Sequence, residues 1–283
     1  MEPPAAWPAR KVPESAAHQS DRAAPAQLPT DIPDFTGRDE QVARLCDLLS
    51  PRQDGTEPGQ EDEPAGSARH EADGAVRVVL VVGAGGVGKT ALAVHAAHAL
   101  ARRFPHGQLF ASLRAATQPV APAEVLARFL RDLGVDAARI PADLEERAAQ
   151  YRTVLAGRQV LIVLDDARNA AQVQTLLPGS GSCAVIVTAR SQMPDLVGCR
   201  IVNLGLLPRD DARTLFAQVT GPDRTLAEPA ATEDVLAACA GLPLAIRIAG
   251  GRLAARESWT VRALADRLAD ERRRLDEFRA GNL

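Results

Sequence analysis

Apolar residues occur along this chain in two alternating kinds of run. Short runs rich in β-branched residues are typical of buried strands, and longer stretches with apolar positions at helical spacing follow most of them. The predicted strands cover residues 76–82, 109–113, 160–164, 184–187 and 200–204. Strands that alternate with helices predict an α/β domain with a five-stranded parallel sheet, flanking helices and right-handed crossovers.

The predicted helices fall into two groups along the chain. Asp39 is expected to cap a helix within residues 35–50, because apolar residues recur on one face after it. The later helices of this first group cover residues 90–103, 122–133 and 144–155. From Pro208 onward the strand signals stop, and the predicted helices cover residues 210–219, 231–239, 244–255 and 261–274. We therefore predict an α/β domain over 29–207 and a small helical subdomain over 208–283.

Two segments show no periodicity at all. Residues 1–28 are rich in proline, alanine and polar side chains, and predict a disordered tail or linker. Residues 51–75 hold seven acids against two arginines, and predict a flexible acidic insert. Neither segment resembles a signal peptide, and no stretch reaches the roughly 18 apolar residues of a membrane helix. Because the four cysteines are scattered, we expect them to be buried thiols of a cytoplasmic protein with no membrane partner.

The composition is that of a globular protein and excludes some partners. The 283 residues are 46% hydrophobic and 3% aromatic, with a net charge of −3, so neither a stacking platform for nucleic acid nor general attraction to DNA or membranes is expected. The basic run 272–274 lies within residues 252–283, where eight arginines face six acids, as on solvated helix faces. No direct nucleic-acid binding is therefore expected. Of 33 basic residues only two, Lys11 and Lys89, are lysine.

Lys89 lies in a glycine-rich motif between a predicted strand and a predicted helix. Residues 83–90 match GxxxxGK[ST], in which glycines let backbone N–H groups surround phosphates. Lys89 would reach the β- and γ-phosphates and act in catalysis, and Thr90 would offer its hydroxyl to Mg²⁺. The residues expected to bind the phosphates are Gly83, Ala84, Gly85, Gly86, Val87, Gly88, Lys89, Thr90 and Ala91. The overlapping GxGxxG pattern of dinucleotide sites is less favoured, because Lys and Thr follow it directly.

Polar residues end the next two buried runs. Asp165 and Asp166 follow the run 160–164, where Asp165 would hold Mg²⁺ and Asp166 would orient or deprotonate the attacking water. The alternative is that this pair caps the following helix. Arg190 ends the run that begins at 185, and it would sense the γ-phosphate unless it is a solvated surface residue.

Five blocks in this order resemble the NB-ARC branch of the STAND-type P-loop ATPases. They are residues 35–40 (Phe-Thr-Gly-Arg-Asp-Glu), the phosphate loop, the run ending in Asp165 and Asp166, residues 187–190, and residues 241–244 (Gly-Leu-Pro-Leu). The last block is preceded by residues 211–216, which resemble a helix common in this family. Residues 27–38 and 140–143 resemble the ATPase module of actinobacterial SARP/AfsR-type transcriptional regulators. The resemblance covers roughly residues 27–283.

This resemblance implies a P-loop NTPase fold that binds ATP or ADP with Mg²⁺. The strand ending in Arg190 would lie between the phosphate-loop strand and the acidic strand. Phe35, Thr36 and Arg38 would lie near the adenine or ribose, and Pro243 would pack on the adenine face. Without the resemblance, Pro243 could simply break a helix, and Arg38 could pair with Asp39 or Glu40 at the surface.

The function implied is a nucleotide-operated regulatory switch with weak ATPase activity. Alternatives are an ADP-binding scaffold without significant turnover and, less favoured, a small-molecule or nucleoside kinase. The family normally continues into a winged-helix domain whose MHD histidine contacts the bound diphosphate, and SARP regulators carry DNA-binding domains. Residues 279–283 end about where the winged-helix domain would begin, so we expect a fragment of a larger regulator or a natural minimal form. Its partners would be the nucleotide, flanking regulatory domains or another copy of the chain.

Overall fold

The computed structural model of the chain describes residues 24–50, 75–114 and 120–280. Its five strands form one parallel sheet in the order β2-β3-β4-β1-β5. The strands are β1 (Arg77–Val82), β2 (Gln108–Ser112), β3 (Leu161–Ala167), β4 (Ala184–Ala189) and β5 (Arg200–Asn203). The predicted fold class is confirmed, and β4 lies between β1 and β3 as the family resemblance implied.

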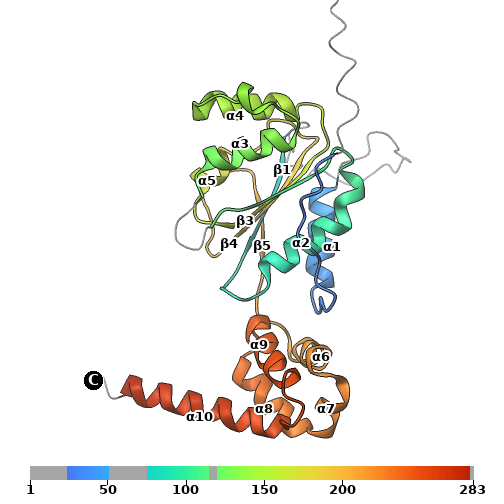
Figure 1. Cartoon of the computed structure of the whole chain (residues 1–283), viewed down its shortest axis with the longest axis vertical. Helices are drawn as coiled ribbons and strands as arrows, with labels where there is room; N and C mark the ends of the chain where they lie inside the picture. The colour runs from blue at the N-terminus through green and yellow to red at the C-terminus, as the bar shows by residue number, and fades with distance from the viewer. Residues whose placement is uncertain (1–23, 51–74, 115–119, 281–283) are drawn as a thin grey trace, which may run out of the picture.

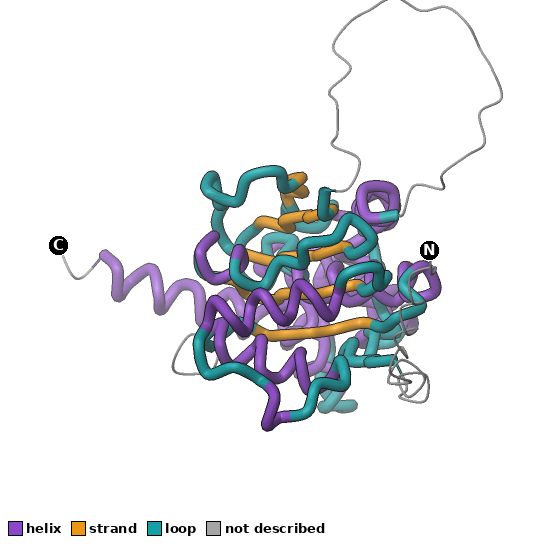
Figure 2. Tube along the Cα trace, turned by 90° about the horizontal axis from the view of Figure 1, so that it is seen from above, coloured by secondary structure: helices purple, strands orange, loops and turns teal. Residues whose placement is uncertain are grey.

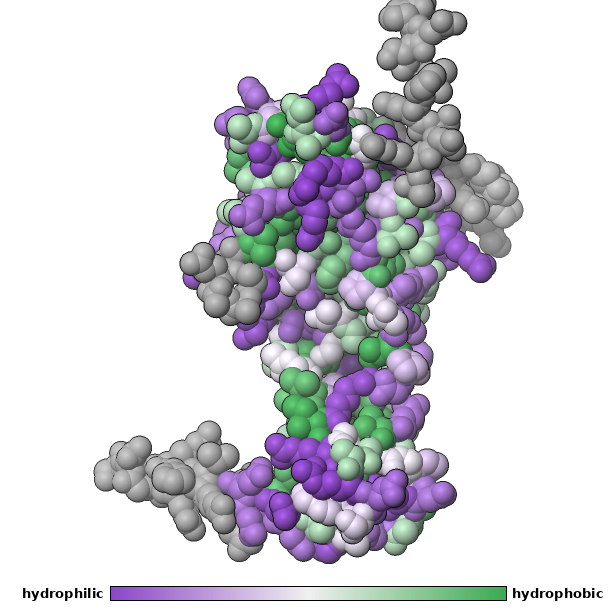
Figure 3. Space-filling model, in the orientation of Figure 1, coloured by the Kyte–Doolittle hydropathy of each residue, from purple (hydrophilic) through white to green (hydrophobic). Residues whose placement is uncertain are grey.

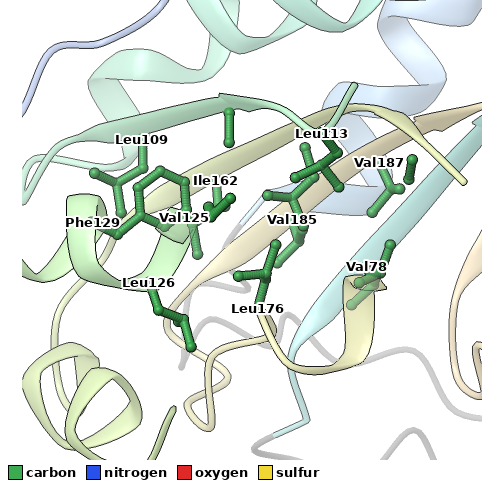
Figure 4. Close-up of a cluster of buried hydrophobic side chains, with 14 of the residues drawn as sticks. Val78, Leu109, Leu113, Val125, Leu126, Phe129, Ile162, Leu176, Val185 and Val187 are labelled. Carbon is green, nitrogen blue, oxygen red and sulfur yellow. The ribbon is translucent and has the colours of Figure 1, made fainter. Parts of the chain in front are cut away.

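Helices cover both faces of this sheet (Figures 1 and 2). One face carries α1 (Asp39–Leu49) and α2 (Lys89–Leu100), and the other carries α3 (Pro122–Asp132), α4 (Leu144–Leu155) and the short α5 (Ala170–Gln174). Alternate residues of β1 point into the two cores: Val78 and Leu80 face one layer of helices, and Val79 and Val81 the other. Figure 4 shows Phe129 and Val125 of α3 packed beside Leu109 and Ile162 in the first core.

The helical part of the chain has a core of its own. It consists of α6 (Arg209–Thr220), α7 (Pro222–Ala227), α8 (Pro229–Cys239), α9 (Pro243–Ala254) and α10 (Val261–Ala280). Phe216, Val235, Ile246 and Leu253 are fully or almost fully buried among these helices. The 20-residue α10 extends away from the rest of the molecule (Figure 1). Among these helices, α7 was not predicted from the sequence.

A narrow junction connects the two parts of the molecule (Figure 1). The space-filling view shows apolar residues gathered at this narrowing (Figure 3). Exposed large apolar residues include Leu206, on the connection after β5, and Leu244 and Ile248, one turn apart on α9. Among the described residues, we find no helix with the length and apolar character that crossing a membrane requires.

Two local predictions differ from the structure. Asp39 is the first helical residue of α1, and the N-cap is Arg38, whose side chain makes no capping hydrogen bond. The prediction of an Asp39 cap is therefore wrong, although Asp39 and Glu40 still favour the positive end of the helix dipole. The predicted helix from residue 90 begins one residue earlier, and its last turn, Ala101–Arg103, is a 3-10 helix.

The last five residues of the predicted tail belong to the described structure. Residues 24–28 belong to the ordered structure: Gln27 N–H donates to the Gln108 carbonyl (3.0 Å), and Gln108 N–H donates to the Pro25 carbonyl (2.6 Å). Leu28 packs against the core under α1 and α2. These residues continue the edge of the sheet beside β2, so the prediction of disorder is wrong for them. Residues 1–23 and the acidic insert over 51–74 lie outside the described residues.

Candidate functional site

The glycine-rich loop follows β1 and leads directly into α2. Gly86 and Gly88 have φ angles of +79° and +97°, in a region that residues with a Cβ rarely adopt. The loop therefore turns tightly just before α2, whose first helical residue is Lys89. Helix N-termini present unpaired N–H groups and a partial positive charge, so this arrangement suits an anion.

The side chain of Lys89 bends back over this loop. Its ammonium Nζ donates to the Ala84 carbonyl at 2.9 Å, and the residue is 8% exposed. Burial lowers the pKa of Lys89 from its usual value, while the carboxylates of Asp166 and Asp165 raise this pKa and Arg190 lowers it. The one lysine of the described residues thus lies against the loop, within electrostatic reach of the two acids near the end of β3.

Asp165 is held by two hydroxyl groups at the end of β3. Thr90 Oγ1 and Thr188 Oγ1 both donate to Asp165 Oδ1 at 2.7 Å. The carboxylate is nearly buried, with Asp165 8% exposed. Thr90 and Asp165 are thus a hydroxyl and a carboxylate side by side, and these are ligand types that Mg²⁺ accepts.

Thr188 was not singled out from the sequence, although it lies in the quoted run 187–190. Besides its bond to Asp165, its hydroxyl accepts the backbone N–H of Asp166 at 2.9 Å. Thr188 is 1% exposed, so a single buried hydroxyl positions both acidic residues. One sequence signal could have indicated Thr188: it lies near the end of a buried strand, β4, that pairs with the strand carrying Asp165 and Asp166.

Asp166 occupies an irregular point of the sheet. The pairing of β3 with β4 shifts register between Leu164 and Ala167, and Asp166 has a φ of +52°. Its carboxylate lies between two guanidinium groups: Arg114 Nη1 is 3.3 Å from Oδ2, and Arg190 Nε is 3.6 Å from Oδ1. Arg114 was not predicted. The Arg190 side chain is 58% exposed and pairs with Asp166, while its predicted contact with the γ-phosphate stays a prediction.

The acidic pair does not cap the next helix. The N-cap of α5 is Asn169, whose side chain accepts the N–H of Gln172 at 3.0 Å. The capping alternative for Asp165 and Asp166 is therefore wrong, and their carboxylates point toward Thr90 and the two arginines instead.

The predicted base-side residues lie on the segment before α1. The Phe35 ring stacks on the His95 ring of α2, with centroids 3.9 Å apart. Thr36 Oγ1 donates to Gln218 of α6 at 2.7 Å. Arg38, only 7% exposed, donates to the Gly205 carbonyl at 2.6 Å. Burial lowers the pKa of Arg38, and Asp211 partly offsets this effect.

Arg38 therefore does not have the surface pairing that was the alternative prediction. Its guanidinium group donates to Gly205, on the connection between the α/β and helical parts, and Asp211 of α6 is the acid that raises its pKa. This residue ties the segment before α1 to Gly205, where the chain leaves the sheet.

The N-terminus of α9 lies against the glycine-rich loop. Pro243 is the first residue of α9, and the N–H of Leu244 donates to the Gly86 carbonyl at 3.2 Å. One turn later, Arg247 Nη2 is 2.7 Å from Asp34 Oδ1. Pro243 follows the break after α8 and begins α9, and its packing on the adenine face stays a prediction.

These elements enclose one cavity of about 350 Å³, within the size range of small-molecule sites. Its lining comes from the segment before α1, the loop with the start of α2, and the helical part. The lining residues are Ile32, Asp34, Phe35, Thr36, Arg38, Gly86, Val87, Gly88, Lys89, Thr90, Ala91, Leu207, Leu215, Pro243, Leu244 and Arg247.

Six predicted site residues lie outside that lining. Asp165, Asp166 and Arg190 connect to it through Thr90 and Lys89. The other three are the first residues of the loop, Gly83, Ala84 and Gly85. The sequence did not single out six other lining residues, which are Ile32, Asp34, Leu207, Leu215, Leu244 and Arg247. Of these, Leu207 and Arg247 lie outside every quoted block and reach the cavity only through the fold.

The sequence and the fold of this chain are similar to those of known proteins. The NB-ARC domain family matches residues 68–225. The chain is 49% identical to Regulatory protein AfsR of Streptomyces coelicolor over 259 residues, which is 91% of this chain and 25% of that protein. It is 27% identical to Disease resistance protein RPV1 of Vitis rotundifolia over 203 residues, covering 63% of this chain and 13% of that protein.

Among solved structures, the Aeropyrum pernix ORC1 protein in complex with DNA aligns with a TM-score of 0.53. The alignment has 16% identity and covers 86% of this chain and 66% of that one, so it concerns the fold alone. The chain spans about a quarter of the length of the AfsR proteins that it matches. Together with the phosphate loop and the acidic strand, the family match over more than half of its residues shows that this chain belongs to the NB-ARC domain family.

Proposed function

We propose that this chain is an ATP/ADP-binding regulatory switch module that hydrolyses ATP slowly with Mg²⁺, within a bacterial transcriptional regulator. The observation that carries this proposal is the shared cavity, which is lined by the phosphate loop and also by Pro243, Leu244 and Arg247 of α9. A nucleotide bound there would contact both parts of the molecule. Its affinity would then depend on how the two parts pack, which is the requirement for a ligand-operated switch.

Each side of the cavity suits one portion of a nucleotide. Phe35, Thr36, Arg38 and Pro243 would surround the base and ribose, while the loop residues, Lys89 and the N-terminus of α2 would bind the phosphates. Thr90 and Asp165 would hold the magnesium ion, which supplies charge neutralisation on the phosphate oxygens when it is bound.

The surroundings of Asp166 support slow rather than fast hydrolysis. This carboxylate is the group proposed to orient the attacking water, and it contacts both Arg114 and Arg190. Each arginine occupies an acceptor position of the carboxylate that a water could use. Exchange of Arg190 from Asp166 to the γ-phosphate would free such a position and couple hydrolysis to a rearrangement around the loop.

Three contacts connect the nucleotide side to the helical part. They are the Leu244–Gly86 backbone bond, the Arg247–Asp34 ion pair and the Thr36–Gln218 hydrogen bond. A nucleotide that favours or breaks these contacts would shift the packing of α6 and α9. This differential contact is the proposed basis of the switch.

The relatives support a place within a longer protein. Both AfsR proteins bear the name regulatory protein and are about four times as long as their matched region. We propose a cytoplasmic module whose partners are the nucleotide and flanking regulatory domains, with self-association as a further mode. Direct binding of nucleic acid or membrane by these residues is not part of the proposal.

Nucleotide binding by Lys89→Ala tests the proposal. Protein purified without added ligand should retain ADP or ATP, identified by mass, and calorimetry should show at least a roughly ten-fold loss of affinity for both in the variant, because its phosphate cation is gone. Lys11→Ala removes the chain's only other lysine and is the matched control. Unchanged ATP and ADP affinities in Lys89→Ala would refute the proposal.

The ADP-binding scaffold remains the second candidate function. The observation that favours it is the same pairing of Asp166 with two arginines, which occupies the proposed base. Comparing ATP hydrolysis by the parent and by Asp166→Asn separates the two candidates. A lower rate in Asp166→Asn supports turnover, and equal rates remove Asp166 from catalysis and favour the scaffold.

A further inference from the structure

We propose that Arg114 is a second phosphate-sensing arginine, which lets the site distinguish a nucleoside triphosphate from a diphosphate. This inference rests on the proposed function and assigns a role to a residue that no sequence motif indicated. It starts from the position of Arg114, two residues beyond the end of β2.

The backbone brings Arg114 to the acidic end of β3. Ser112 of β2 pairs with Asp165 in the parallel register, and the N–H of Leu113 donates to the Asp165 carbonyl at 2.8 Å. Arg114 therefore leaves the sheet at its carboxyl edge, where open α/β sheets bind their ligands.

A buried amide holds this part of the backbone in place. Gln172 of α5 is 7% exposed, and its Nε2 donates to the carbonyls of Leu113 and Val120, both at 3.1 Å. Its Oε1 accepts the N–H of Arg168 at 3.1 Å. Because its amide oxygen and nitrogen are both used, Gln172 positions the residue from which Arg114 follows.

The strand order places one arginine on each side of the acidic strand. β3, which carries Asp166, lies between β2 and β4, and Arg114 follows β2 while Arg190 follows β4. Their guanidinium groups contact different oxygens of the Asp166 carboxylate, at 3.3 and 3.6 Å. Of the two carboxylates, Asp166 raises the pKa of Lys89 more than Asp165 does.

The charges of this group favour an added anion. Three cations, Lys89, Arg114 and Arg190, face two carboxylates, Asp165 and Asp166, which leaves one net positive charge. Both arginine side chains are more than half exposed, at 54% and 58%, and exposed ion pairs contribute little free energy. They can therefore exchange Asp166 for a phosphate at small cost.

A guanidinium group is well suited to that exchange. Its planar donors bind phosphate oxygens in pairs, which an ammonium group cannot do. ADP lacks the terminal phosphate, so a residue that contacts this group strengthens triphosphate binding without affecting diphosphate binding. Arg114 and Arg190 together sense the terminal phosphate from both sides of Asp166.

The test compares two nucleotides on the full chain with Arg114→Gln. A fluorescent ADP analogue is displaced by ADP or by the non-hydrolysable β,γ-imido analogue of ATP, each with Mg²⁺. We expect about a ten-fold loss of affinity for the triphosphate analogue, equal to about 1.4 kcal/mol, and less than about a two-fold change for ADP. Arg131→Gln is the control: it removes the same charge from an exposed α3 arginine that donates to the Ala127 carbonyl of its own helix.

A second background separates direct contact from positioning of Asp166. In Asp166→Asn, the effect of adding Arg114→Gln on the triphosphate analogue should persist, because the contact is to phosphate. Its disappearance in that background, an equal loss for ADP, or an unchanged triphosphate affinity would each overturn the inference. Arg114→Lys keeps the charge without the planar donors and should give an intermediate loss. Thermal unfolding of every variant confirms that it is folded.

Lys89→Ala distinguishes failure of this inference from failure of the proposed function. If Lys89→Ala weakens both nucleotides while Arg114→Gln weakens neither, only the role of Arg114 is wrong. If Lys89→Ala leaves both affinities unchanged, the nucleotide site itself is wrong.

Discussion

Two adjacent glycines of α9, Gly250 and Gly251, should respond in opposite directions to the same substitution. An ideal Cβ on Gly250 would lie 2.7 Å from Val219 Cγ1 of α6, and one on Gly251 would meet no atom within 4 Å. Gly250 is buried against α6, whereas Gly251 is exposed on the same helix. The pair therefore tests whether close contact between α6 and α9 is required for stability.

The magnitude follows from two opposing terms. Replacing glycine by alanine inside a helix stabilises it by up to about 1 kcal/mol, so Gly251→Ala should gain roughly 0.5–1 kcal/mol. Gly250→Ala receives the same gain. The Val219 side chain cannot turn its Cγ1 away from the new methyl group, because a β-branched side chain has one strongly preferred rotamer in a helix. The helices must then separate, which costs about 1–3 kcal/mol and leaves a net loss of up to about 2.5 kcal/mol.

Unfolding in urea followed by circular dichroism measures both changes. Since α9 begins at Pro243 in the cavity, a displaced α9 should also weaken ADP binding several-fold in Gly250→Ala, measured by calorimetry, and leave it unchanged in Gly251→Ala. A Gly250→Ala protein as stable as Gly251→Ala would show that the gap between the helices can accommodate a methyl group. The reasoning from the contact with Val219 would then be refuted.

Three further perturbations address the contacts around the cavity. Arg247→Gln and Asp34→Asn should each speed ADP release several-fold in stopped-flow displacement. Because the two residues form one ion pair at 2.7 Å, the double variant should release ADP no faster than either single variant. Additive effects would contradict this. Gly86→Ala places a Cβ 3.0 Å from Leu244 Cβ at a φ of +79°, so it should lose about 1–2 kcal/mol in urea unfolding, whereas Gly85→Ala, with no atom within 4 Å, should not. Thr188→Val removes the hydroxyl shared by the two acids and should cost about 1–3 kcal/mol and reduce the gain in ADP affinity on adding Mg²⁺, with Thr188→Ser close to the parent.

The repeating pattern of the α/β part was sufficient to predict its sheet. Residues 78–82 and 184–187 are apolar on both faces, because each strand packs against helices on both sides, and such continuous runs are distinctive. The short β5 is exposed at three of its four residues and carries the weakest signal of the five strands, since it lies at the edge of the sheet. The helix α7 was missed because its six residues begin with proline and are too few for a periodic pattern.

The site was predictable only where its residues are joined by a local motif. The glycine loop is such a motif. Its positive φ angles at Gly86 and Gly88 and the helix that begins at Lys89 are set by residues adjacent in sequence. Arg114 has no local signal, because its relation to Asp166 exists only through the pairing of β2 with β3. The Asp39 cap was also wrong: the helix starts at Asp39 itself, one residue earlier than the cap required, and the N-cap is Arg38, which donates to Gly205 far along the chain.

The contacts that would make this module a switch join residues far apart in sequence, so no local pattern indicates them. Asp34 and Arg247 are 213 residues apart in sequence, and Thr36 and Gln218 are 182 apart. Each pair closes the same cavity from the segment before α1 to the helical part, so each contributes only when the two parts are packed together. A motif search can therefore identify the glycine-rich loop, but the proposed coupling between that loop and the helical part depends on pairs of side chains that meet only in the folded state. Substitutions at Asp34 and Arg247 should for this reason alter nucleotide release while leaving the phosphate contacts of Lys89 intact.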